Sequence, residues 1–263
     1  MSGERRGRGR ASLGVPRSSS PSEAYGAFAY AYDQALGERF FRSLRRLLRR
    51  VLERHPARVK THLDLACGTG LAMEYFASLG YRSFGVDLSL PMLRIAQGRA
   101  RALAAGDIRA LPLRGTFARV TCLYDSLNHL KSAADLTAAF RGAAAVLDAD
   151  GLLLFDINHP DIYPEIWGSS EPFVADGADY HLEMATKYRA RDRTAQAMVS
   201  GWAEAGGRRV RIHERREQRA WSEREMVEAL AAAGLVPIEV LRFDPYSEAR
   251  TVKLFFVCSH ARP

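Results

Sequence analysis

The spacing of hydrophobic positions changes along the chain between a helical and a strand-like pattern. Apolar residues recur at helical spacing over residues 40–52, whereas the apolar runs at 63–65, 81–87 and 152–158 are short and are bounded by turn residues. Short apolar runs that alternate with helical segments are typical of parallel strands connected by helices. The first part of the chain is therefore predicted to form an α/β fold.

Beyond about residue 178 the pattern becomes that of an antiparallel ribbon. Three runs have strand character, at 180–189, 195–204 and 208–218. Gly206 and Gly207, between the last two runs, predict a tight hairpin turn. We expect this ribbon, over residues 178–220, to follow the fifth strand and to precede one more helix and two closing strands.

The turn after the strand at 63–65 is built from small residues. Residues 66–70 read Ala-Cys-Gly-Thr-Gly, and a helical pattern begins at Leu71. Glycine lets a ligand approach the backbone, and the helix N-terminus offers unpaired N–H groups. Asp87 ends the next strand, 23 positions after Asp64. A carboxylate at this place binds ribose hydroxyls in nucleotide-binding folds, so the sequence predicts a nucleotide or nucleoside site.

Three segments together resemble the first motifs of class I S-adenosylmethionine (SAM)-dependent methyltransferases. They are LDLACGTG at 63–70, GVDLS at 85–89 and AGDI at 105–108, in the family's order and spacing. The resemblance implies a Rossmann-like seven-stranded, mostly parallel sheet with helices on both faces, an antiparallel last strand, and SAM as the cofactor. The rival, an NAD-binding domain of an oxidoreductase, requires a third glycine where this chain has Met73.

The resemblance also implies a set of cofactor contacts. In the family, the acid of the third motif binds the adenine amino group and the next apolar residue packs on the base. An N-terminal segment with a Tyr-Asp pair closes over the cofactor, which makes Tyr30 and Tyr32 candidates; an ordinary amphipathic helix is the alternative. The expected cofactor-binding residues are Tyr32, Asp64, Ala66, Cys67, Gly68, Gly70, Asp87, Leu88, Asp107, Ile108, Leu123 and Tyr124.

The loop after the fourth predicted strand carries the candidate catalytic groups. Because ligands bind beyond the carboxyl ends of strands in open α/β sheets, residues 125–130 are expected beside the reacting end of the cofactor. This loop lacks the Asn-Pro-Pro-Tyr and Asp-Pro-Pro-Tyr motifs of enzymes that methylate nucleic-acid amino groups. The candidates for a base or an orienting group are His129, Tyr124 and His159, with His213 of the ribbon as a further one. A structural role is the alternative for each histidine.

Composition and charge limit the binding partners and the cellular location that can be expected. The 263 residues carry a net charge of +8, and the Gly-, Ser- and Arg-rich segment 1–22 is expected to be a disordered basic tail. Both this tail and the arginine-rich outer face of the helix at 40–52 allow nucleic-acid binding or plain solvation. The three cysteines lie far apart, which predicts no disulfide framework and no metal site and favours a reduced, cytoplasmic location. No apolar stretch is long enough to span a membrane.

The predicted organisation is a tail, residues 1–22, and a SAM-dependent methyltransferase domain, residues 23–263, with a helical lid at 23–56. We expect it to transfer a methyl group to a nitrogen or oxygen of a small-molecule acceptor by in-line displacement, as a monomer or homodimer without a membrane partner. One alternative is an RNA or protein methyltransferase, whose binding would collapse as salt rises. Another is a SAM-binding regulatory domain without catalysis.

Overall fold

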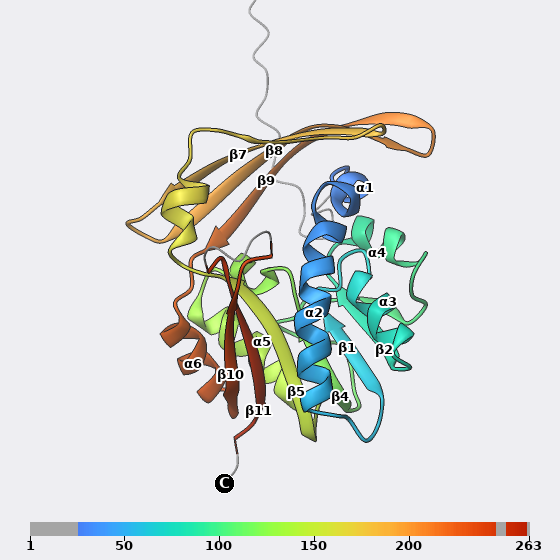
Figure 1. Ribbon diagram of the computed structural model, residues 1–263, viewed down its shortest axis with the longest axis vertical. Helices are drawn as coiled ribbons and strands as arrows, with labels where there is room; N and C mark the ends of the chain where they lie inside the picture. Colours follow the sequence, from blue (N-terminus) through green and yellow to red (C-terminus); the bar gives the residue numbers. More distant parts are fainter. Residues whose placement is uncertain (1–25, 246–250, 262–263) are drawn as a thin grey trace, which may run out of the picture.

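The computed structural model describes residues 26–245 and 251–261. Within these ranges, two sheets are present (Figure 1). Sheet A has the strand order β10-β11-β5-β4-β1-β2-β3, and sheet B has the order β6-β7-β8-β9. The first five strands of sheet A run parallel, and β11 runs antiparallel to β5 and β10. This arrangement confirms the Rossmann-like fold and the antiparallel last strand that the sequence predicted.

The elements follow one another as β-α units and then as a meander. Sheet A consists of β1 (Thr61–Leu65), β2 (Arg82–Asp87), β3 (Leu103–Ala105), β4 (Phe117–Cys122), β5 (Leu147–Asn158), β10 (Leu235–Phe243) and β11 (Lys253–His260). Sheet B consists of β6 (Phe173–Asp176), β7 (Tyr180–Arg189), β8 (Thr194–Ala205) and β9 (Arg208–Arg219). The helical segments are α1 (Ala29–Tyr32), η2 (Asp33–Gly37), α2 (Glu38–Arg54), α3 (Leu71–Ser78), α4 (Leu90–Ala96), η3 (Ser126–His129), α5 (Ala133–Ala145), η4 (Tyr163–Trp167) and α6 (Glu223–Ala231).

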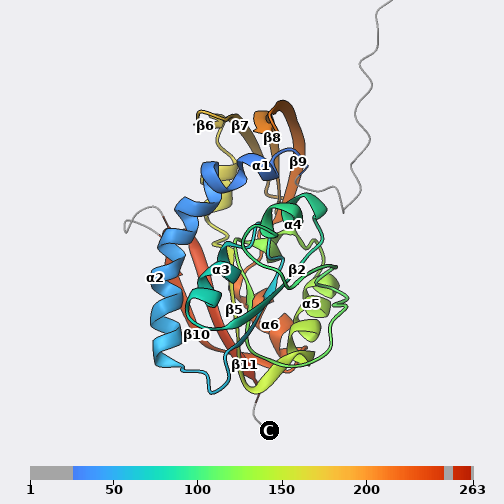
Figure 2. The same ribbon diagram turned by 90° about the vertical axis from the view of Figure 1, so that its right-hand side faces the viewer.

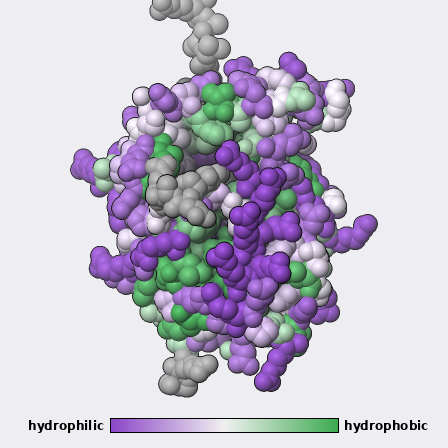
Figure 3. Space-filling view, viewed as in Figure 1, coloured by the Kyte–Doolittle hydropathy of each residue, from purple (hydrophilic) through white to green (hydrophobic). Residues whose placement is uncertain are grey.

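Helices cover both faces of sheet A (Figure 2). On one face, α2 and α3 pack on β5 and β11; on the other, α5 and α6 pack on the central strands. The apolar stripe of α2 is buried, whereas its arginines form a hydrophilic strip on the molecular surface (Figure 3). Burial of apolar area on both faces is the main stabilising contribution of this three-layer arrangement.

Local details of the elements include two helix caps and one bulge, and the predicted ribbon is corrected. Ser89 caps α4, and Ser222 with Glu225 forms a capping box at the start of α6. Residues 148–151 form a bulge within β5, because Phe117 of β4 pairs with Leu147 whereas Arg119 pairs with Leu152. The ribbon has a fourth strand, β6, whose exposed residues gave no alternating pattern. The expected tail, residues 1–22, lies outside the described residues.

Sheet B lies across the end of sheet A at which β1, β4 and β5 terminate, with α1 beside it (Figures 1 and 2). Phe28 and Ala31 pack into sheet B against Leu182, Val199 and Ile212. The Glu214 side chain on β9 accepts a hydrogen bond from the backbone N–H of Phe28, at 3.1 Å. The N-terminal segment is therefore attached to sheet B as well as to α2. None of the described helices has both the length and the apolar character needed to cross a membrane.

Candidate active site

A cavity of about 1230 Å³ lies where the N-terminal segment, the ends of β1, β2 and β4, and the strand β9 meet. Its lining includes almost all the cofactor-binding residues expected from the sequence. These are Tyr32, Asp64, Ala66, Cys67, Gly68, Asp87, Leu88, Asp107, Ile108, Leu123 and Tyr124. Gly70 is not part of the lining. The structure thus brings together, at one end of the sheet, residues that are up to 92 positions apart in the chain.

The turn after β1 has left-handed backbone at Ala66, Gly68 and Gly70, with φ of 54°, 54° and 85°. Gly68 can adopt this conformation without strain, and its backbone N–H donates to Asp87 Oδ2 at 2.7 Å. A Cβ on Gly70 would make an ordinary contact with the Cβ of Ala96, at 3.4 Å, so the left-handed backbone rather than lack of space favours glycine here. Gly70 therefore shapes the turn, whereas Gly68 faces the cavity.

Asp87 is the acid at the end of β2, and it is buried at the cavity wall. Besides Gly68, the backbone N–H of Ser89 donates to it, at 2.7 Å to Oδ1. Burial raises the pKa of Asp87, and these two backbone hydrogen bonds oppose that rise. Each carboxylate oxygen is thus held in place by one backbone donor, and remaining lone pairs can accept hydroxyl groups.

Asp107 follows β3, an edge strand of sheet A, whereas Asp64 lies on β1 in the middle of the sheet. The Arg109 guanidinium donates to both of its carboxylate oxygens and also to Asp135, at 3.0 Å. Hydrogen bonds from Arg109 lower the pKa of Asp107, so this acid stays ionised. The neighbouring Ile108 is buried and presents an apolar surface to the cavity.

Asp64 is the most perturbed acid of the site. Burial raises its pKa to about 7, a hydrogen bond from the Thr121 hydroxyl at 2.5 Å opposes the rise, and the Asp87 charge adds to it. A buried acid of this kind at a cavity wall is typical of a functional site.

The loop between β4 and η3 is held in an unusual conformation by a buried acid. Tyr124 and Asp125 have φ of 62° and 49°, and both of their backbone N–H groups donate to Asp156, at 2.7 and 3.0 Å. Lys253 contacts Asp125 and lies 3.1 Å from Asp156. This cluster fixes the loop that carries Tyr124 and His129. Sequence reasoning missed it, although a lysine at the start of an apolar closing strand was a visible signal.

Tyr124 lines the cavity, but its hydroxyl donates to the backbone carbonyl of Gly37, at 3.2 Å. Its ring packs against Phe40 with centroids 4.6 Å apart. Tyr124 therefore also holds the segment that precedes α2 in place.

The candidate histidines occupy different places. His129 lines the cavity, and its Nδ1 lies 2.9 Å from the carbonyl oxygen of Glu217. Because a carbonyl only accepts, Nδ1 carries the proton and Nε2 is the acceptor nitrogen. Burial lowers the pKa of His129, which keeps the ring neutral. His213 also lines the cavity, from β9. His159 does not; its ring accepts from the backbone N–H of Asp161, at 3.3 Å.

The aromatic residues that follow β5 do not line the cavity. Tyr163 is fully buried, and its hydroxyl donates to Gln218 at 2.9 Å. Trp167 packs on it in a cluster with Tyr188. They join η4 to sheet B rather than line the cavity, because the chain turns away from sheet A after β5.

One wall of the cavity comes from sheet B. Met198 on β8 and residues 211 and 213–217 on β9 line it, with Lys131 beside them. This part of the lining carries more basic than acidic side chains. Glu214 pairs with Arg216, and Glu217 pairs with both Arg215 and Lys131, so four basic groups including Arg211 face two acids.

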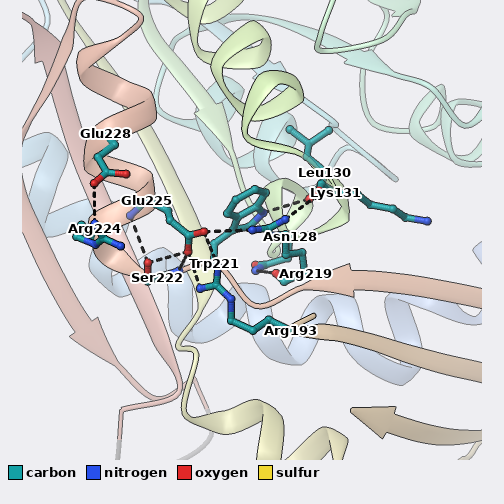
Figure 4. Close-up of polar contacts among 10 residues, drawn as sticks. All are labelled: Asn128, Leu130, Lys131, Arg193, Arg219, Trp221, Ser222, Arg224, Glu225 and Glu228. Carbon is teal, nitrogen blue, oxygen red and sulfur yellow. Dashed lines mark hydrogen bonds and ion pairs between the residues drawn. The ribbon is translucent and has the colours of Figure 1, made fainter. Parts of the chain in front are cut away.

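A network at the base of β9 fixes the wall relative to the η3 loop (Figure 4). The Asn128 amide donates to the backbone carbonyl of Arg219 at 2.8 Å, and the Trp221 indole donates to that of Leu130 at 3.2 Å. Glu225, at the start of α6, binds Arg193 at 2.6 Å and Arg219 at 3.2 Å. This network thereby links β9 and α6 to the loop that carries His129.

The fold and these motifs resemble those of known proteins. Residues 63–151 match the family model described as "Methyltransferase domain". The chain is similar over 90% of its length to a structure of an S-adenosylmethionine-dependent methyltransferase from Clostridium acetobutylicum, with a TM-score of 0.75 and 24% identity, covering 99% of that chain. The resemblance to the class I SAM-dependent methyltransferases is thus confirmed in fold and motifs.

The chain is also similar to proteins from Streptomyces. The chain is 35% identical over 117 residues to the dTDP-3-amino-3,6-dideoxy-alpha-D-glucopyranose N,N-dimethyltransferase of Streptomyces fradiae, covering 44% of this chain and 45% of that one. It resembles the structure of DesVI from Streptomyces venezuelae with a TM-score of 0.71 and 22% identity, covering 93% of this chain and all of DesVI. The chain spans about half the length of the curated relatives that it matches most strongly.

Proposed function

We propose that this protein is a SAM-dependent methyltransferase that methylates a nitrogen or oxygen of a small-molecule acceptor. The observation that carries the proposal is the shared cavity, where the motif residues form one wall and β9 with His129 forms another. Its volume of about 1230 Å³ leaves room for a second molecule beside a cofactor. The names of the sugar N-methyltransferase relatives agree with an amine acceptor.

The lining fits the cofactor chemically along its whole length. Asp87 can accept both ribose hydroxyls, and Ile108 beside Asp107 provides a flat apolar surface for the adenine ring. Acidic Asp64 and the aromatic ring of Tyr32 suit the positively charged methionine part. Bound SAM would supply an activated methyl carbon on a sulfonium.

The protein's own residues would then bind both reactants, orient them and remove the proton of the acceptor. Holding two reactants in line can contribute about 7–11 kcal/mol to the lowering of a barrier. His129 Nε2 is the acceptor nitrogen of a neutral ring at the cavity, so it can take the proton that an alcohol or protonated amine loses. We also propose that residues 26–37 cover the cofactor.

Calorimetric titration with S-adenosylhomocysteine, beside NAD, tests the cofactor assignment. Micromolar binding of the first and none of the second is expected. Transfer of labelled methyl groups from SAM to amino sugars and other small amines then tests the activity. Binding of NAD alone, or transfer only to RNA with steep loss at raised salt, would overturn the proposal.

A further inference from the structure

A chain of hydrogen-bonded side chains crosses the middle of sheet A and ends at Asp64. Ser83 Oγ lies 2.7 Å from His62 Nδ1, and His62 Nε2 lies 2.8 Å from Thr121 Oγ1. The Thr121 hydroxyl donates to Asp64 Oδ1 at 2.5 Å. His62 and Thr121 have no exposed surface. No step proposed above uses Ser83, His62 or Thr121.

The strand register explains why these four side chains meet. His62 pairs with Ser83 on β2, and Asp64 pairs with Thr121 on β4. His62 and Asp64 are two positions apart on β1, so they point to the same face of the sheet. That face packs against α3, where the Phe76 ring stacks on His62 with centroids 3.7 Å apart. Burying polar groups in such a layer is costly unless every one is paired.

When Asp64 is ionised, the hydrogen atoms in this chain have only one consistent direction. The Thr121 hydroxyl has a single hydrogen, which it gives to the Asp64 carboxylate. Its oxygen must therefore accept the hydrogen of His62 Nε2. Nδ1 is then the acceptor nitrogen, and the Ser83 hydroxyl donates to it. All three donors thus point toward Asp64.

The groups around Asp64 raise its pKa, and the hydrogen-bonded chain acts against that rise. Burial raises the pKa of Asp64 to about 7, and Asp87 adds repulsion. The Cys67 and Cys122 thiols also face it and stay neutral, because burial raises the pKa of each. Tyr124, from the next loop, is neutral for the same reason. Burial lowers the pKa of His62 to about 3, so His62 offers a neutral N–H donor across the working pH range.

We propose that Ser83, His62 and Thr121 are positioning residues that keep the Asp64 carboxylate ionised and aimed at the cationic methionine part of the cofactor. Asp87 and Asp107 lie on the part of the cavity toward β3, where the ribose and adenine would bind. The part of the cavity beside β1 and β4 is then left for the methionine part of the cofactor. This inference rests on the proposed function, since it requires SAM or its product in the cavity.

The test is the affinity for S-adenosylhomocysteine between pH 5.5 and 8.5, measured by calorimetry. Affinity of the wild type is expected to fall as pH drops and Asp64 takes up a proton, and Asp64→Asn should be weak and insensitive to pH. Thr121→Val keeps the shape of the side chain and removes the donor. It should bind about tenfold more weakly at pH 7, the equivalent of one charge-assisted hydrogen bond, and its loss of affinity should begin at higher pH. Thr121→Ser should restore the wild-type profile.

His62→Phe, which can still stack on Phe76, should shift the profile in the same direction as Thr121→Val but less. Thr186→Val, in sheet B, is the matched control and should leave the profile unchanged. A purely structural role would lower the melting temperature of these variants without moving the pH midpoint, and that result would overturn the inference. If the wild type itself does not bind S-adenosylhomocysteine, the proposed function fails instead.

Discussion

Arg99 donates to Asp33 Oδ2 at 2.6 Å, which joins the residues after α4 to the segment before α2. Arg99 also donates to the Thr69 carbonyl at 3.2 Å, and the Thr69 hydroxyl donates to Asp33 at 2.6 Å. The ion pair is mostly buried, with 21% and 13% of the two side chains exposed. It therefore fixes the N-terminal segment to the glycine turn at the edge of the cavity.

We expect Arg99→Gln to loosen this segment and to release S-adenosylhomocysteine faster. Losing one partner of a largely desolvated pair acts mainly on the dissociation rate, so an increase of about tenfold is expected in stopped-flow measurements. Arg101→Gln is the control, because Arg101 is exposed and contacts no carboxylate within the part of the chain that the structure describes. Equal dissociation rates for both variants would show that the segment does not cover the ligand.

Asp87→Asn should weaken S-adenosylhomocysteine binding by about 10- to 100-fold, because neutral amide oxygen replaces a charged acceptor of hydroxyl groups. Calorimetry at pH 7.5 measures the change. Asp179→Asn, in an exposed turn of sheet B, removes the same charge away from the cavity and should have no effect. Unchanged affinity of Asp87→Asn would remove the ribose role from this acid.

His129→Gln should lower kcat by about 10²- to 10⁴-fold for an acceptor that must lose a proton, with little change in cofactor affinity. The lowered pKa of His129 means that the base stays neutral as pH falls, so half-maximal kcat should lie below pH 6.5. Single-turnover kinetics across pH 5–8 measures both. His181→Gln, on β7, is the control, and a wild-type pH profile in His129→Gln would exclude this base.

Lys253→Met should destabilise the fold by about 3–5 kcal/mol, because it leaves the buried Asp156 and the half-buried Asp125 without their cation. Urea unfolding measures the free energy. Lys187→Met removes an exposed lysine from β7 and should change it by less than about 0.5 kcal/mol. Similar unfolding midpoints for the two variants would contradict the role of Lys253.

Glu225 should make stability depend on pH in the acid range. Burial raises the pKa of Glu225, but hydrogen bonds from Arg193 and Ser222 outweigh burial and lower the pKa from 4.5 to about 2. The contribution of ionised Glu225 to the free energy of unfolding is fully present above pH 4.5 and is lost as pH falls toward 2. Glu225→Gln should therefore cost about 1–3 kcal/mol at pH 7, with the difference from the wild type shrinking below pH 4.5. A constant difference from pH 7 to pH 2.5 in urea unfolding would argue against this.

The fold could be predicted from sequence because its signals are local. The buried runs of β1 and β5, the caps at Ser89 and Ser222, and the spacing from Asp64 to Asp87 each depend on a few neighbouring residues. Most predicted cofactor residues therefore line the cavity, and their binding roles remain predictions.

The contacts that hold the site together could not be predicted in this way. Asp33 and Arg99 are 66 positions apart, and Lys253 reaches Asp125 from the other end of the chain. Such pairs follow from how strands and helices cross in space, which no local pattern encodes. His159 shows the same limit, because the chain after β5 leaves the cavity although the strand itself points toward it.

The placement of sheet B has a consequence for how such a protein can diversify. The two apolar cores around sheet A contain no residue from 159–220, whereas β9 supplies a whole wall of the cavity. Substitutions at the residues of β8 and β9 that line the cavity would reshape the proposed acceptor side without touching the two cores around sheet A. We therefore expect a change of acceptor through these positions to cost little stability.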